Sequence, residues 1–186
     1  MSGTAIRPGF HPAQRLVDLA NALRGDPALP REALAELLAR HGERPEDLTA
    51  TAFSTADAER LRAAVLRVAR ILTLTDTDRA ALTVNELLAG SDARPRLSRH
   101  DGHSWHLHLD RGEDSGWDDW FTASSALALA QIISENGRAT WGECAAPNCA
   151  NLYLGTGPGA AQRYCSTTCA SRTRVAAHRR RKRDSP

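Results

Sequence analysis

The four cysteines of the chain lie together near its C-terminal end, and their type and spacing could hold a metal ion. They form two pairs, C-x4-C at Cys144 and Cys149 and C-x3-C at Cys165 and Cys169. Four thiolates paired in this way suit tetrahedral zinc, which selects sulfur and nitrogen ligands. Because protein sulfur would fill all four positions, the pattern favours a structural zinc over a catalytic one. Free thiols, a redox-active pair and an iron site are the alternatives.

The absence of targeting signals in the sequence indicates the compartment in which these thiols would be found. The N-terminal residues lack the apolar segment of a secretory signal peptide, and no apolar run approaches the length of a membrane helix. We therefore expect a cytoplasmic protein with no membrane partner. In a reducing compartment, paired cysteines bind metal more often than they form disulfides.

A basic segment follows the second cysteine pair directly. Residues 172–183 carry seven basic side chains and no acidic one, whereas residues 1–171 carry 17 basic and 21 acidic residues. A basic tail on an acidic body indicates a polyanionic partner for the tail alone. Helical arginine in the major groove of DNA can contact guanine, and flanking arginine can contact phosphate. The predicted DNA-binding residues are Arg172, Arg174, His178, Arg179, Arg181, Lys182 and Arg183. A solvated tail that binds nothing specific is the alternative.

The residues around the cysteines predict the elements that position them. Cys144–Cys149 would form a knuckle, and Asn151–Leu154 and Gln162–Cys165 would form two short strands. Ser166 can cap a following helix, with Cys169 in its first turn and Val175 and Ala176 on its packing face. A knuckle, a hairpin and a helix in this order resemble a treble clef. We therefore expect residues 141–183 to form a four-cysteine zinc finger with a basic C-terminal helix.

This segment also resembles a known family. C-x4-C, an L-Y-L-G-T stretch and R-Y-C-S ahead of a last cysteine and a basic helix are similar to the CGNR zinc finger, named for a Cys-Gly-Asn-Arg signature. This chain has Cys169-Ala170-Ser171-Arg172 there and keeps the Cys and the Arg. In that bacterial family the finger follows a domain called ABATE, of stress-induced transcription regulators. The stretch L-V-D-L-A-N-A-L at residues 16–23 resembles the start of that domain. The resemblance implies a ligand-responsive regulator that binds zinc and DNA.

Residues 1–140 predict a mostly helical domain that carries one β-hairpin. Alternating apolar and polar residues on both sides of Asp101-Gly102 predict the hairpin near residues 96–109. Apolar residues recur at helical spacing in five segments, at Pro12–Arg24, Arg31–His41, 54–72, 76–88 and 122–135. The expected fold is therefore mainly α with a small β-hairpin, α+β in the N-terminal domain, plus the treble-clef-like zinc finger at the C-terminus.

Two clusters in this domain could bind a ligand. Four histidines near the hairpin suit a metal site or a pH sensor, or else the polar outer face of an edge hairpin, which we favour. They are His100, His103, His106 and His108. Four aromatic residues could line a ligand pocket between hairpin and helices, or they could fill a core. They are Trp105, Trp117, Trp120 and Phe121.

Taken together, these features favour a DNA-binding transcriptional regulator. Its partners would be double-stranded DNA at the finger and, at the N-terminal domain, a small-molecule effector or a second subunit in a homodimer. The rival interpretation is a zinc-thiolate redox switch or a module that binds protein or RNA. The sequence has no nucleophile motif, phosphate-binding loop or H-E-x-x-H, so we do not expect an enzyme.

Overall fold

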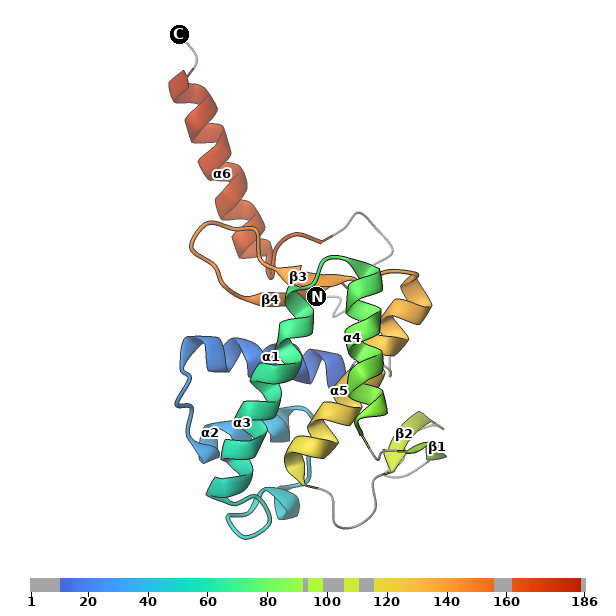
Figure 1. Cartoon of the computed structure of the whole chain (residues 1–186). Coiled ribbons are helices and arrows are strands. Elements are labelled where there is room, and N and C mark those ends of the chain that lie inside the picture. The colour runs from blue at the N-terminus through green and yellow to red at the C-terminus, as the bar shows by residue number, and fades with distance from the viewer. Residues whose placement is uncertain (1–10, 92–93, 99–105, 111–115, 156–161, 185–186) are drawn as a thin grey trace.

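The computed structural model describes residues 11–91, 94–98, 106–110, 116–155 and 162–184, and they form a helical body from which one helix extends (Figure 1). Within the described residues, the body contains the short 3-10 helices η2 and η3 and two pairs of strands. In chain order the elements are α1 (His11–Gly25), α2 (Arg31–Arg40), η2 (Pro45–Leu48), α3 (Thr55–Ala69), η3 (Arg70–Thr73), α4 (Thr77–Ala89), β1 (Arg94–Ser98), β2 (His106–Asp110), α5 (Trp117–Asn136), β3 (Trp141–Glu143), β4 (Leu152–Leu154) and α6 (Thr167–Asp184).

Helix ends follow local sequence signals. Ser54 begins α3 with a capping box, in which its hydroxyl accepts from the Asp57 amide and the Asp57 carboxylate accepts from the Ser54 amide. Asp76 caps α4 with a single bond, in which its carboxylate accepts from the Arg79 amide. Gly137 ends α5 in the left-handed conformation at φ 65°, which glycine adopts readily.

Helix α5 is longer than the sequence indicated. The prediction began it near residue 122, but it begins at Trp117, so Trp117, Trp120 and Phe121 lie in its first turn and a half. Asp118 and Asp119 lie in that first turn, where acidic side chains are favoured by the helix dipole. Trp117, Trp120 and Phe121 follow helical spacing and turn toward the core, which is why this stretch winds into the helix.

The core lies where α5 packs against α1, α3 and α4 (Figure 1). Its largest fully buried side chains are Phe53, Phe121 and a set of leucines and isoleucines from α1, α2, α3, η3 and α5. None of the described helices combines the length and the apolar content needed to cross a membrane.

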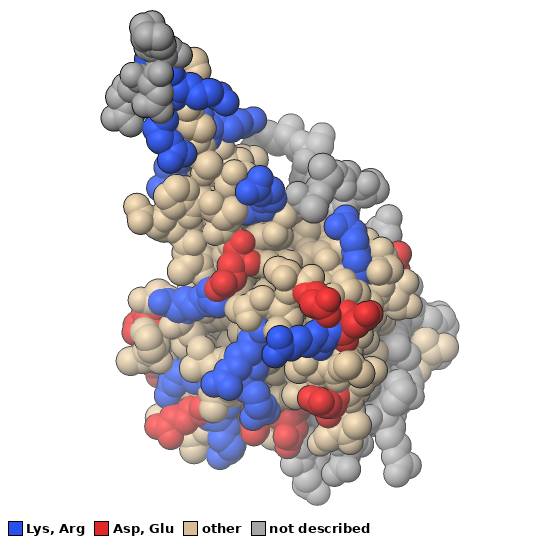
Figure 2. Space-filling view, turned by 45° about the horizontal axis from the view of Figure 1, so that its top comes forward, with Lys and Arg blue, Asp and Glu red and all other residues tan. Residues whose placement is uncertain are grey.

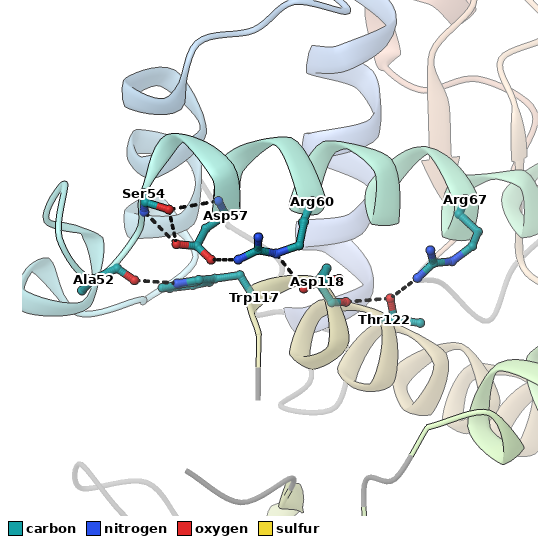
Figure 3. Close-up of polar contacts among 8 residues, drawn as sticks. All are labelled: Ala52, Ser54, Asp57, Arg60, Arg67, Trp117, Asp118 and Thr122. Atoms are coloured by element: carbon teal, nitrogen blue, oxygen red, sulfur yellow. Dashed lines mark hydrogen bonds and ion pairs between the residues drawn. The ribbon is translucent and has the colours of Figure 1, made fainter. Parts of the chain in front are cut away.

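Polar contacts tie α3 to α5 along one side of this core (Figure 3). Arg60 pairs with Asp57 and with Asp118, and Arg67 Nη2 donates to Thr122 Oγ1 at 3.0 Å. Arg60 and Arg67 therefore help to hold α3 against α5.

The predicted hairpin is confirmed as the antiparallel pair β1 and β2. Leu97 lies opposite Leu107, and the ladder runs from Arg94 opposite Asp110 to Ser98 opposite His106. The predicted turn at Asp101-Gly102 and the residues His100, His103 and Trp105 lie outside the described residues.

A second antiparallel pair, β3 and β4, corrects the prediction for the finger. Residues 152–154 are a strand as expected, but their partner is Trp141–Glu143 and not Gln162–Cys165, whose described residues are not a strand. The reason is packing. Trp141, Leu152 and Leu154 are buried in the same core as the helices, and the Trp141 indole N–H donates to the Ile71 carbonyl at 3.1 Å. The hairpin is therefore fixed by the body on which it lies.

Candidate metal centre and nucleic-acid interface

The four cysteine sulfurs meet at one point beside the β3–β4 hairpin. All four lie within 4.8 Å of one another, and the three pairs among Cys149, Cys165 and Cys169 are 3.7, 3.7 and 3.8 Å apart. Sulfurs on a regular tetrahedron about zinc, with Zn–S bonds of about 2.3 Å, lie about 3.8 Å apart. A disulfide would need about 2.05 Å, and all four cysteines are free. The cluster fits zinc binding.

Local backbone structure brings the first cysteine pair into place. Cys144 follows β3, and its amide donates to the Asn151 carbonyl at 2.8 Å, which closes the knuckle between the two strands. Asn148 adopts a left-handed conformation at φ 60°, which asparagine tolerates better than most residues. The chain reverses there and points Cys149 back toward Cys144.

The second pair is set by the start of α6. Cys165 lies just before the helix and Cys169 lies in its first turn, as predicted. Ser166 provides the expected cap, because its hydroxyl accepts from the Cys169 amide at 3.2 Å. The Ala145 amide donates to the Arg163 carbonyl at 2.8 Å and so holds the knuckle against the segment that carries Cys165.

Hydrogen bonds to sulfur shape the electrostatics of the cluster. The Cys165 amide donates to Cys144 Sγ at 3.4 Å, and Arg172 Nη2 donates to Cys169 Sγ at 3.4 Å. Without metal, the Arg172 bond lowers the pKa of Cys169 to about 6, whereas burial raises the pKa of Cys165 to about 12. Arg172, predicted as a DNA contact, thus lies against the sulfur cluster.

The remaining predicted DNA-binding residues lie along α6, which extends away from the body (Figure 1). Figure 2 shows basic side chains covering this helix, while acidic and basic side chains are mixed over the body. Exposed side chains there include Arg174, His178, Arg179, Arg181 and Lys182, and the side chain of Arg183 lies outside the described residues.

The predicted packing face of α6 is wrong. Val175 is 49% exposed and Ala176 is also exposed, because no described part of the body lies beside that stretch of the helix. Among the described residues of α6 beyond Arg172, every side chain is exposed or partly exposed, so most of this part of the helix is accessible.

The three described aromatics of the predicted ligand pocket make core contacts. Phe121 is fully buried. The Trp117 indole N–H donates to the Ala52 carbonyl at 3.0 Å (Figure 3), and Trp120 stacks on the Arg15 guanidinium at 3.9 Å. His106 and His108 lie in β2.

Contacts between α1 and the finger were missed by the sequence analysis. The Asn21 amide bonds both backbone groups of Leu152, donating to its carbonyl at 3.0 Å and accepting from its amide at 2.7 Å. Arg24 donates to Glu143 Oε1 at 2.8 Å and also to the Ala150 carbonyl. A polar amide among the apolar residues of L-V-D-L-A-N-A-L is the signal that could have indicated this contact.

Comparison with known families covers most of the chain. The model of the ABATE family, described as "Putative stress-induced transcription regulator", matches residues 13–135. The model of the CGNR zinc finger matches residues 140–182. No curated protein matches the chain significantly.

Proposed function

Since this chain belongs to the ABATE family, we propose that it is a DNA-binding transcriptional regulator whose zinc finger and basic helix contact duplex DNA. The observation that carries the proposal is the placement of α6. This helix is fixed at its first turn by the cysteine cluster and extends from the body with exposed basic side chains (Figures 1 and 2).

The dimensions of α6 suit the major groove. Its 18 residues span about 27 Å, and a groove about 12 Å wide admits one α-helix. Arg174 and Arg181 follow one line of the helix, and Arg172 and Arg179 follow a line on the opposite side. Arg174 and Arg181 would face one of the two phosphate strands that bound the groove, and Arg179 would face the other. Arg172 holds the first turn through its bond to Cys169 Sγ.

Zinc would fix the direction of this helix. We assign one ion to Cys144, Cys149, Cys165 and Cys169, whose sulfur spacing supports the assignment. A helix without tertiary contacts is marginal in water, and like charges three and four residues apart weaken it further. The metal would hold the first turn of α6 and so supply the nucleus from which the basic part continues. The N-terminal domain would bind the effector or the second subunit of a homodimer.

Salt dependence of binding to a labelled duplex tests the proposal. Three to five phosphate contacts per chain are a reasonable expectation for one helix, so affinity should fall about 40- to 500-fold between 50 and 200 mM salt. Arg174→Ala with Arg181→Ala should reduce both the affinity and the salt slope. Arg70→Ala with Arg79→Ala is the matched control, because it removes the same charge from exposed sites on the body.

A truncation after Val175 is the decisive variant. It keeps all four cysteines and should keep one zinc per chain, while Cys149→Ser should lower the zinc content. If the truncated protein binds duplex DNA as well as the intact chain does, the DNA-binding proposal fails. Retention of RNA or an acidic protein instead would favour the interaction-module alternative. DNA release that follows oxidant-driven zinc loss would favour the redox switch.

A further inference from the structure

A cavity of about 410 Å³ lies between α1 and the finger, away from the tryptophans of the body. One wall is α1, which contributes Gln14, Val17, Asp18 and Asn21. The opposite wall is the finger, which contributes three of the four cysteines and, from α6, Thr168 and Arg172. Its volume is within the range of small-molecule sites, about 300–1,000 Å³.

The charged groups of the cavity favour a positively charged ligand. Asp18 is 42% exposed, and its two oxygens accept one bond each, from Gln14 at 2.8 Å and from His41 at 3.0 Å. A carboxylate has about four acceptor sites, so acceptor capacity remains. With zinc bound, the four thiolates would add a second negative group on the facing wall, partly offset by Arg172. The one basic side chain of the described lining, Arg172, is bonded to Cys169 Sγ.

The neutral part of the lining can accept hydrogen bonds and cover methylene groups. Val17, Leu152 and Leu154 border the cavity and supply only a narrow apolar strip, because they are 3%, 1% and 6% exposed. Gln14 and Gln162 each use their amide nitrogen in a bond within the protein, and each has a side-chain oxygen that can accept another. Ammonium groups joined by short alkyl chains match this combination of carboxylate, amide oxygens and apolar surface.

We propose that this cavity binds a small organic cation of the di- or polyamine class, with Asp18 as its main anchor. The regulatory consequence rests on the proposed DNA-binding function. A ligand that touches both walls binds best when the finger is docked on α1. It therefore stabilises the docked position of the finger and, through it, the direction of α6.

Thermal unfolding and calorimetry on the zinc-loaded protein without DNA test the site, with putrescine and spermidine as probes. At a hundredfold excess over Kd, the melting temperature should rise by about 5–10 °C. Asp18→Asn should weaken binding about tenfold or more, because a charge-assisted bond is lost. Gln14→Glu replaces the N–H that bonds Asp18 with a second carboxylate beside it, and the resulting pair of negative charges should bind the two ammonium groups of putrescine more tightly than wild type. Asp78→Asn, the same change at an exposed position on α4, should leave binding unchanged.

Uncharged and anionic analogues decide whether charge is what the cavity selects. If 1,4-butanediol or succinate binds as well as putrescine, the cation assignment is overturned. If Asp18→Asn folds and binds putrescine like the wild type, the location is overturned. Truncation after Val175 separates this proposal from the DNA proposal, since the truncated protein keeps the entire described lining and should lose DNA affinity but not putrescine affinity.

Discussion

Replacing Asn21 with alanine should loosen the finger from the body. Asn21 sits on α1 and satisfies both backbone groups of Leu152, at 2.7 and 3.0 Å, and Leu152 is only 1% exposed. Alanine removes both partners at once and leaves a buried amide and a buried carbonyl of β4 without hydrogen bonds. The substitution therefore weakens the contact between α1 and β4 and leaves the four cysteines unchanged.

The size of the effect follows from these two groups. A buried polar group left without a partner costs about 1–3 kcal/mol, so two such groups give roughly 2–6 kcal/mol. Asn21 also borders the cavity between α1 and the finger, from which water can reach the vacated site. We therefore expect the low end, about 2 kcal/mol, or a melting temperature roughly 4–8 °C lower for a chain of this length.

The free energy of unfolding in urea, measured for three variants, separates the loss of the Asn21 contact from a general effect of substitution. Asn21→Asp keeps an acceptor for the Leu152 amide but places a second oxygen against the Leu152 carbonyl, so it should be at least as destabilising as alanine. Asn85→Ala is the matched control, since Asn85 is exposed on α4 and alanine favours helix there. Zinc content should be equal in all variants. If Asn21→Ala unfolds within about 0.5 kcal/mol of the wild type, with unchanged hydrogen exchange at β4, the docking argument is refuted.

Two further predictions concern the body. Arg15 and Glu43 form an ion pair at 2.8 Å, and their side chains are 7% and 21% exposed. Burial lowers the pKa of Arg15 to about 10 and raises the pKa of Glu43, so the cost of burying the two charges outweighs their attraction. Glu43→Leu alone should lower the free energy of unfolding by about 3–5 kcal/mol, and Arg15→Met combined with Glu43→Leu should lower it much less. A double-mutant cycle by urea unfolding measures both values. Equal losses of stability would contradict the prediction. Hydrogen bonds from Ser54 lower the pKa of Asp57, so its stabilisation is present above about pH 4 and is lost as pH falls through the folded-state pKa. Asp57→Asn should therefore melt below the wild type at pH 7 and converge with it in acid, and a gap that persists at low pH would show another cause.

Local signals in the sequence were sufficient for the cysteine cluster and for most helices. Cysteine pairs at short spacing define a metal site without knowledge of the rest of the chain, and Ser54, Asp76 and Gly137 set helix ends by bonds to residues a few positions away. Family membership was also visible in the finger, because its motif is compact. The helix ends depend on contacts within about one turn of chain, and the cysteine cluster joins two pairs that are each local but lie at least 16 residues apart.

The errors occurred where distant contacts decide the structure. Trp141 lies in a strand because Ile71, 70 residues earlier, accepts its indole N–H and because the core covers its ring. Val175 was placed on a packing face because its periodicity is right, but no described element lies beside it. A helical or strand pattern indicates which side chains of a segment can be buried, but it does not indicate which other element will pack over them.

The finger is only partly independent of the helical body, because part of it shares the core of the body. The β3–β4 hairpin falls within the finger match, yet Trp141, Leu152 and Leu154 belong to the core of the body. The cysteines form a separate small cluster with Ala146 and Tyr164. Metal loss should therefore act first on that small cluster and on α6, while the hairpin stays with the helices that cover it. In this arrangement α1 is the element through which the body can act on the basic helix, because it contacts the core on one side and holds β4 through Asn21 on the other.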